Sequence, residues 1–282
     1  WANKGQVIGI NTNQGKNTIS YNVVRDLTCN SPSNDYVGNA AVIGISQQST
    51  SADQNVSGNT VYDLSSTYSG NRSVNVTGIY YYGGTLGTNV ISANFIHSLN
   101  AATADAALNG IKIYAGTTSA YNNIINLGEG ITTGLSIYGL YENGNAGNNS
   151  SMFFNTVYIG GIVSGTTGST YALFSATNNN SRDFRNNILN NARNGGSSGS
   201  HYAVRIGGMS NVTIDYNDYY VSGTPSLLGR IGSQDKTTFA DWQLATSQDA
   251  NSVNLDPGFD SPEGTNSTDY VSSAALPGVA VS

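Results

Sequence analysis

Residues 89–96 read NVISANFI and contain the pattern that organises the whole chain. An apolar residue stands three positions before Asn94, and another stands two positions after it. The same frame recurs around seven asparagines, which are Asn22, Asn59, Asn94, Asn123, Asn155, Asn187 and Asn217. Successive asparagines lie 29 to 37 residues apart. We therefore interpret the chain as about seven repeats that share a constant core and differ in loop length.

Three apolar columns accompany these asparagines. The column three residues before them contains Ile19, Val56, Ile91, Ala120, Met152, Phe184 and Ile214. The column two residues after them contains Val24, Val61, Ile96, Ile125, Val157, Leu189 and Tyr219. A third column, upstream in each repeat, contains Ile10, Ile45, Ile79, Ile111, Leu135, Leu173 and Val204. The short apolar and polar alternation around these positions is typical of half-buried strands.

Three short strands per repeat cannot bury an apolar face alone, whereas stacked repeats give each apolar residue a like neighbour above and below. The sequence therefore predicts an all-β fold, a right-handed, single-stranded parallel β-helix of about seven coils over residues 1–222. We expect the asparagines to form one axial ladder, with rungs about 4.8 Å apart. Asparagine suits such a column because it tolerates the left-handed conformation at a tight bend and its amide can bond the next rung.

The repeat stops near residue 222, and residues 223–282 are predicted to form a C-terminal cap and tail on the same solenoid. The segment TTFADWQLAT, residues 237–246, has Phe239, Trp242 and Leu244 or Ala245 at roughly helical spacing, which indicates a short amphipathic helix. A cap is expected because an open β-helix end exposes unpaired strand edges. No comparable segment precedes Val7, so we expect a preceding domain or another subunit to cover the N-terminal end.

Composition excludes several classes of partner. The 282 residues include only 11 Lys and Arg against 17 Asp and Glu, for a net charge of -6. Such a chain offers no basic face for nucleic acid. It also contains no apolar run of about 18 residues, so membrane insertion is not expected.

The repeated coils resemble right-handed parallel β-helix repeat proteins of the pectate-lyase-like superfamily. The tail is similar to the segment that ends such helices in large secreted proteins of Bacteroidota, on the evidence of Phe239, Trp242, Gln243, Asp249, Ala250, Asn251, Ser252, Asp256, Pro257 and Phe259. This resemblance implies a secreted, extracellular or cell-surface protein, often one that leaves by type IX secretion and carries adhesive modules. No sorting domain is visible in the sequence, which leaves the route of secretion open.

The superfamily includes polysaccharide lyases and glycoside hydrolases, so we consider an enzyme. Asp26 and Asp63 each lie four residues after a ladder asparagine, which predicts two carboxylates one rung apart. Such a pair could hold Ca²⁺, the one cofactor suggested, or act as the two acids of a glycosidase. The simpler explanation, which we favour, is that both are solvated turn aspartates, eased by Arg25 nearby. Lysines and histidines are few, so the sequence argues against catalysis.

Tyrosines offer a more suggestive feature. Tyr82, Tyr114 and Tyr138 lie three residues beyond Ile79, Ile111 and Leu135, at positions that alternation points outward. Tyr80 and Lys112 stand beside them. These five residues are the predicted ligand site, where stacked rings bind a glycan or another surface protein; the alternative is that the rings only stabilise the sheet. The sequence thus favours a structural or adhesive module over the alternative of a polysaccharide lyase or hydrolase.

Overall fold

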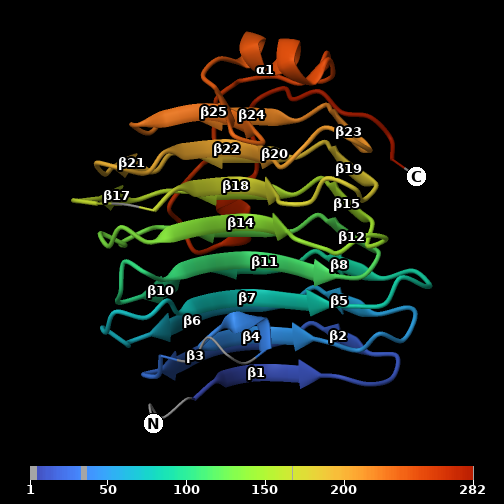
Figure 1. Cartoon of the computed structure of the whole chain (residues 1–282), viewed down its shortest axis with the longest axis vertical. Coiled ribbons are helices and arrows are strands. Elements are labelled where there is room, and N and C mark those ends of the chain that lie inside the picture. Colours follow the sequence, from blue (N-terminus) through green and yellow to red (C-terminus); the bar gives the residue numbers. More distant parts are fainter. Residues whose placement is uncertain (1–4, 33–36, 167, 282) are drawn as a thin grey trace.

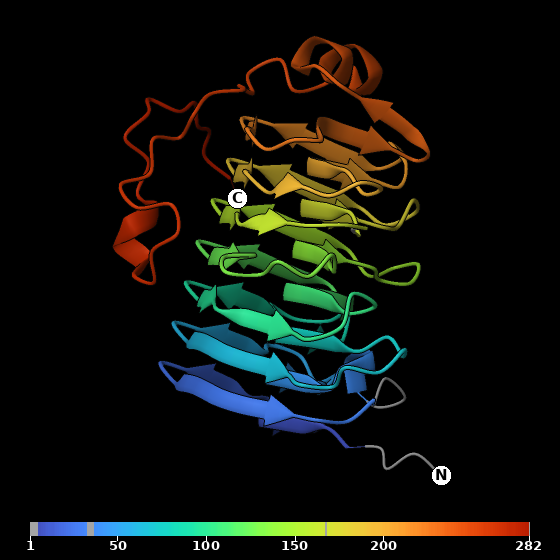
Figure 2. The same ribbon diagram turned by 90° about the vertical axis from the view of Figure 1, so that its left-hand side faces the viewer.

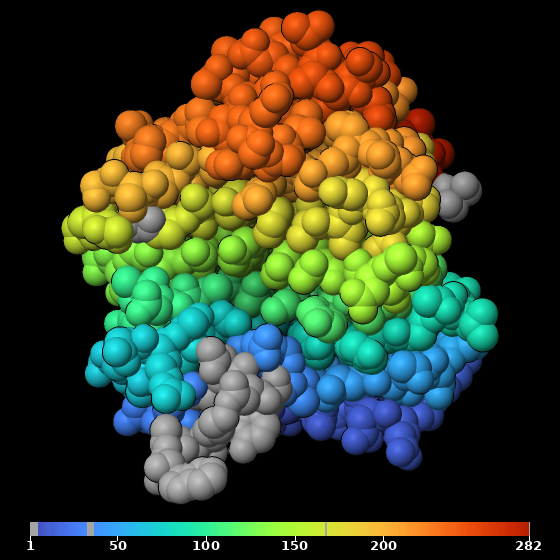
Figure 3. Space-filling model, viewed as in Figure 1, coloured from blue at the N-terminus to red at the C-terminus, as the bar shows by residue number. Residues whose placement is uncertain are grey.

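The structure, a computed structural model, describes residues 5–32, 37–166 and 168–281. It confirms the predicted class, because the described chain forms a parallel β-helix of about seven turns (Figure 1). Three sheets run along the helix, and each turn contributes one strand or strand pair to each sheet. The space-filling view shows the turns packed directly against one another (Figure 3).

Sheet A forms the face that is seen in Figure 1 and contains the strands that carry the predicted tyrosine site. Its members are β1 (Val7–Thr12), β4 (Val42–Gln47), β7 (Asn75–Tyr82), β11 (Ala107–Ala115), β14 (Ser136–Glu142), β18 (Thr170–Ser175), β22 (His201–Ile206), β25 (Ser226–Ile231) and β26 (Gln234–Lys236). All neighbours are parallel except β26, which pairs antiparallel with β25.

Sheets B and C complete each turn. Sheet B contains β2 (Thr18–Ser20), β5 (Asn55–Ser57), β8 (Val90–Ser92), β12 (Thr118–Tyr121), β15 (Ser150–Phe153), β19 (Arg182–Arg185) and β23 (Val212–Asp215). Sheet C contains β3 (Val23–Cys29), β6 (Thr60–Ser66), β9 (Phe95–His97), β10 (Leu99–Ala101), β13 (Ile124–Leu127), β16 (Thr156–Ile159), β20 (Ile188–Asn191) and β24 (Asp218–Val221). A small parallel pair joins β17 (Ile162–Val163) to β21 (Asn194–Gly195), and η1 (Val37–Asn39) is a short 3-10 turn.

The predicted asparagine ladder is confirmed. The side-chain amide of each ladder asparagine donates to Oδ1 of the next one, at 2.9 to 3.0 Å, from Asn22 through Asn217. The backbone N–H of the same asparagine donates to that Oδ1 as well. The ladder lies between sheets B and C, and it satisfies backbone groups that the tight turn would otherwise leave unpaired.

The conformational reason that we gave for asparagine was wrong. The ladder asparagines do not adopt the left-handed conformation; the residue before each of them does, with φ between 53° and 66°. These residues are Tyr21, Gly58, Ala93, Asn122, Phe154, Asn186 and Tyr216. The ladder position itself requires asparagine for its side-chain amide. Its Oδ1 accepts two hydrogen bonds from the ladder asparagine of the neighbouring turn, one from the backbone N–H and one from the side-chain amide.

A second amide column, which the sequence analysis missed, runs along the corner that precedes sheet B. The backbone N–H of Asn17 donates to Gln54, and that of Gln54 donates to Asn89. Farther along, Asn148 and Asn180 accept from the backbone of the preceding turns. Its spacing varies and glutamine replaces asparagine at Gln54, which conceals the column in the sequence.

The first two apolar columns are buried as predicted; the third is buried except at Ile10, which is partly buried, and it needs one correction. In the fifth repeat Leu140, not Leu135, occupies the third column, because β14 aligns Leu140 with Ile111 and with Leu173. Leu135 is buried, but it lies before the strand begins. The register shift moves Tyr138 away from the position that we predicted.

The C-terminal cap contains α1 (Phe239–Thr246), which lies within the predicted segment 237–246. Trp242 and Thr246 are its buried residues, whereas Leu244 and Ala245 are exposed. Asp249 joins the cap to the last turn, because its carboxylate accepts from Trp242 Nε1 at 2.7 Å and from the Tyr219 hydroxyl at 3.0 Å. After the cap, the chain runs back along the outside of sheet C and forms η2 (Ser267–Tyr270), as Figure 2 shows.

Candidate functional site

The predicted ligand residues lie on the outer face of sheet A, where β7 and β11 are neighbours. Tyr80 pairs with Lys112 in the parallel register, and a β-bulge shifts the alignment beside Tyr114. With η1 they enclose a hollow of about 400 Å³, which we call the tyrosine pocket. It is lined by Asn13, Val37, Gly38, Asn39, Gln48, Tyr80, Tyr82, Lys112 and Tyr114.

Two rings form the open wall of the tyrosine pocket. Tyr82 and Tyr114 stack with centroids 6.1 Å apart and planes inclined by 23°. Their side chains remain 39% and 38% exposed, so an apolar ring face is available to a ligand. A tyrosine side chain combines an apolar ring face with a polar hydroxyl group at its tip.

Tyr80 and Lys112 are not open surface residues as we had expected. They are only 5% and 8% exposed, because η1 covers them. Lys112 Nζ donates to the Gly38 carbonyl at 3.3 Å, and a Cβ on Gly38 would come within 3.0 Å of the Tyr80 ring. Burial lowers the pKa of the Lys112 ammonium and raises the pKa of the Tyr80 hydroxyl.

Aromatic rings surround the Lys112 ammonium. Nζ lies 6.0 Å from the centroid of Tyr114 and 5.5 Å from that of Tyr141. Ring faces attract a cation through their quadrupole, which partly compensates the loss of water. The pocket therefore contains a desolvated positive charge beside two exposed rings.

Tyr138 does not belong to the tyrosine pocket, which corrects the predicted site. Its register partners are Asn109 and Tyr171, so it lies one outward column away from Lys112. It stacks on Tyr141 of its own strand, with centroids 4.9 Å apart. We call the group to which it belongs the aromatic seam, made of Tyr138, Tyr141, Tyr171, Phe174 and Tyr202.

The aromatic seam exists because sheet A bends. In β14 both Gly139 and Leu140 face the interior, since a Cβ on Gly139 would lie 2.3 Å from Val157 Cγ1. Two consecutive inward residues bring the outward residues on either side toward each other, which is why Tyr138 and Tyr141 stack. Equivalent glycines occupy the same column in the earlier turns, namely Gly9, Gly44, Gly78 and Gly110.

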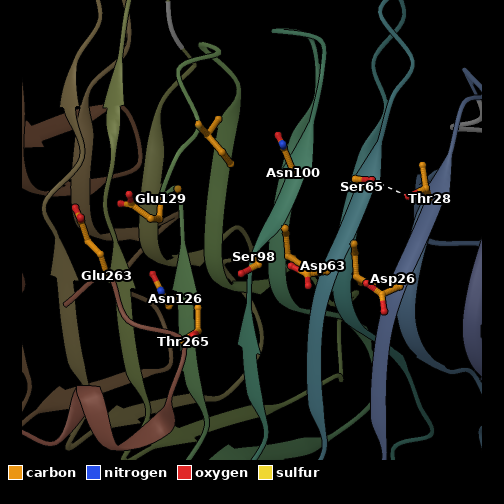
Figure 4. Close-up of a pocket in the computed structure, with 14 residues that line it drawn as sticks. Asp26, Thr28, Asp63, Ser65, Ser98, Asn100, Asn126, Glu129, Glu263 and Thr265 are labelled. Atoms are coloured by element: carbon orange, nitrogen blue, oxygen red, sulfur yellow. Dashed lines mark hydrogen bonds between the residues drawn. The ribbon is translucent and has the colours of Figure 1, made fainter. Parts of the chain in front are cut away.

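The predicted acidic pair lies in a different place, a groove of about 480 Å³ on the outer side of sheet C (Figure 4). Asp26 and Asp63 occupy equivalent bulges in β3 and β6, with φ of 58° and 50°. Glu129 and Glu263 approach the same groove, and Ser98 and Asn126 lie between the two acidic ends (Figure 4). The structure thus brings together four carboxyl groups, of which the sequence had suggested two.

The residues that line the groove include four acidic side chains. Asp26 pairs at 3.2 Å with Arg25, and both side chains are largely exposed. Burial lowers the pKa of nearby His97, and the charge of Asp63 opposes that shift. Among the described residues that line the groove there is no Lys, Arg or His. Such a lining suits uncharged hydroxyl-rich molecules and disfavours anionic ones.

Two further features concern metal ions and membrane spans. Within the described residues, no group of three or more His, Cys, Asp or Glu side chains is arranged to hold a metal ion. The same residues include no helix with the length and apolar character of a membrane span.

Comparison with protein families, curated proteins and solved structures finds no match to this chain. The candidate site therefore has to be interpreted from its own geometry.

Proposed function

We propose that the protein is a non-catalytic β-helix module that binds an acidic glycan in the tyrosine pocket. The observation that carries this proposal is the Lys112 ammonium, buried beneath η1 and bordered by the exposed rings of Tyr82 and Tyr114. A sugar ring stacks on the tyrosine faces while its carboxylate meets the ammonium. Nζ has three donors and one hydrogen-bond acceptor among the described residues, so donors remain for a ligand.

Burial makes this lysine a stronger anion receptor than a surface lysine. The attraction between opposite charges rises as the surroundings become less polar, and water screens a covered ammonium poorly. A charge-assisted hydrogen bond contributes about 1.5–3 kcal/mol. The corresponding change in affinity is about 10- to 100-fold.

Calorimetric titration with a galacturonic acid tetrasaccharide tests this proposal. We expect Lys112→Met to weaken binding by about 10- to 100-fold, while the double variant Tyr82→Ser/Tyr114→Ser removes the stacking surface. Lys16→Met and Tyr21→Ser are matched controls, because these exposed side chains lie outside the pocket. Undiminished binding by folded Lys112→Met would overturn the assignment.

A second candidate function is a glycoside hydrolase, supported by the stacked bulges that carry Asp26 and Asp63 in the acidic groove. A lyase fits less well, because the described lining of the groove offers no basic side chain to abstract a proton. Incubation with neutral glycans, followed by a reducing-end assay, distinguishes the two functions. Activity that disappears in Asp26→Asn/Asp63→Asn would favour the hydrolase over the binding module.

We also propose that the module acts outside the cell or on its surface, in a protein of the pectate-lyase-like superfamily similar to those of Bacteroidota that use type IX secretion. The low charge and the tail residues support this origin. In the first turn the core-facing Val7, Ile10 and Leu27 are only partly buried. This supports the proposal that a preceding domain or another subunit covers the N-terminal turn.

A further inference from the structure

Residues 255–281, which we call the strap, follow the cap and lie along the outside of sheet C (Figure 2). Phe259 and Ser272 form an antiparallel bridge within it. Tyr270 is its buried anchor, with ring centroids 6.2 Å from Phe95 and 6.1 Å from Tyr158. These rings form a cluster separate from the interior core, so the strap can leave without opening the β-helix.

The strap crosses a continuous outward column of sheet C. We call this column the strip: Tyr62, His97, Asn126, Tyr158, Asn190 and Tyr220, which follow one another from turn to turn. At the usual rung spacing it is about 24 Å long. Asn126 lines the acidic groove on one side of the strap, and Tyr158, Asn190 and Tyr220 line a hollow of about 290 Å³ on the other. The strap itself forms part of the wall of both hollows, for example through Glu263 in the first and Phe259 in the second, so its removal would expose the strip as one continuous surface.

The docked strap satisfies the strip only in part: its Gly264 carbonyl accepts from Asn126 Nδ2 at 3.0 Å, but nearby acceptors stay unpaired. Oδ1 of Asn126, Oδ1 of Asn190 and Oδ2 of Asp218 are buried, yet none of them has a hydrogen-bond partner among the described residues. All three side chains are less than 5% exposed. Burying an acceptor without a donor costs free energy, because the acceptor loses its bond to water. Two of these acceptors, on Asn126 and Asn190, belong to the strip, and the strap does not use them.

Like charges also face each other across the contact. The strap carries Asp256, Asp260, Glu263 and Asp269 and no basic residue. Burial raises the pKa of Asp218 to about 7, the Asp256 charge adds to this shift, and the Leu255 amide, which donates to Asp218 at 3.0 Å, opposes it. Burial and then the neighbouring carboxyl of Glu129 raise the pKa of Glu263.

The surroundings of these carboxyl groups contain little positive charge. Tyr220 is the other titratable neighbour of Asp218. Glu263 faces Tyr158 and Tyr270, and Asp269 also lies near Tyr270. The cation beside Glu129 is Arg193, which is buried and donates to the Gly128 and Gly160 carbonyls.

The sign of the pH effect follows from these shifts. A carboxyl whose pKa is raised in the docked state holds its proton more tightly there than in the released strap. Docking is therefore strongest at acidic pH and weakens as the pH rises from about 4, the value for a free carboxyl, through about 7.

We propose that the strap masks a second saccharide-binding site, the strip, which takes an uncharged hydroxyl-rich glycan when the strap lifts at rising pH. Sugar hydroxyls are the donors that the unused Asn126 and Asn190 oxygens require, and Tyr62, Tyr158 and Tyr220 offer ring faces for stacking. The acidic groove repels anionic sugars, which separates this site from the tyrosine pocket on sheet A. The inference does not depend on the proposed function of that pocket.

Calorimetric titration of the full chain with cellohexaose and mannohexaose, at pH 5 and at pH 8.5, tests the proposal. We expect the wild-type protein to bind at least one of them about tenfold more tightly at pH 8.5. Phe259→Ala/Tyr270→Ala removes the anchor of the strap and should bind equally well at both pH values. Asp218→Asn/Glu263→Gln removes the carboxylate charges and should bind weakly at both.

Several results would overturn the proposal. It fails if the Phe259→Ala/Tyr270→Ala protein keeps its circular dichroism and binds neither hexasaccharide, or if Tyr158→Ser in that background leaves binding unchanged. Hydrogen exchange across residues 255–281, corrected for the intrinsic effect of pH, reports strap release directly; equal protection at both pH values would contradict the pH dependence. Titration of the same variants with the galacturonic acid tetrasaccharide tests the tyrosine pocket separately, so either site can fail alone.

Discussion

The turn before each ladder asparagine requires a left-handed residue, and the chain fills that position with different residue types. Gly58 and Asn122 suit it, whereas Tyr21, Ala93 and Phe154 adopt it at a steric cost. The ladder holds these residues in place, because the asparagine that follows each of them is bonded to the next turn and, beyond Asn22, to the preceding turn as well. Local strain is thus offset by hydrogen bonding between turns.

Ala93→Gly should relieve part of that strain. Ala93 has φ of 53° and an exposed side chain, so glycine removes the steric cost without losing packing. The greater freedom of glycine in the unfolded chain offsets part of the gain, and we expect the free energy of unfolding to rise by up to about 1 kcal/mol. The measurement is the urea midpoint, with Ala102→Gly as an exposed control at negative φ that should lower it. A lower midpoint for Ala93→Gly would contradict this account.

Asn123→Ala should be far more damaging. Its amide donates to Asn155 Oδ1 and to the Ile91 carbonyl, and its oxygen accepts from the backbone and side chain of Asn94. The substitution leaves several buried groups unpaired, so the free energy of unfolding should fall by about 2–4 kcal/mol. Asn22→Ala, at the partly exposed end of the ladder, should cost less. Equal shifts in the denaturation midpoints of the two variants would show that the ladder does not carry this stability.

At the scale of elements, sheet A depends on a column of glycines. A Cβ on Gly110 would lie 2.5 Å from Ile125 Cγ2 and 2.7 Å from the Gly139 carbonyl oxygen. Alanine fits the same column only in later turns, at Ala172 and Ala203. The column creates the bend that brings the aromatic rings together.

Gly110→Ala should therefore overpack the interior and lower the free energy of unfolding by about 1–3 kcal/mol. Gly278→Ala is the matched control, because the nearest atom to its new Cβ lies 3.7 Å away. Denaturation midpoints measure both variants. If Gly110→Ala were as stable as Gly278→Ala, the bend in sheet A would need another explanation.

The sequence predicts the ladder well and the tyrosine site only in part. Asparagine recurs with apolar residues at fixed distances on both sides, so one frame fits every turn. Upstream of the ladder asparagine, the fifth repeat contains two similar segments, GLSI at 134–137 and GLY at 139–141. Alternation alone does not decide which of their leucines belongs to the third apolar column. The strand register selects Leu140, which places Tyr138 in the aromatic seam.

Over the whole molecule, the burial of outward-facing residues depends on segments that are distant in the sequence. The alternation of residues within one strand does not predict these contacts. Alternation correctly places Tyr80 and Lys112 on the outer face, but η1 then covers them. Asp26 and Asp63 follow the repeat and could be predicted as neighbours. Glu263 belongs to the strap, which has no periodicity, so its approach to the groove could not be predicted. The β-helix thus arranges two chemically different surfaces, a cationic aromatic pocket on sheet A and an acidic groove on sheet C.

A crystal structure of the protein grown with the galacturonic acid tetrasaccharide tests the central claim most directly. We predict a sugar ring against Tyr82 and Tyr114, with a carboxylate oxygen within about 3 Å of Lys112 Nζ. Saccharide bound only elsewhere, or a tyrosine pocket without saccharide at saturating concentration, would contradict it.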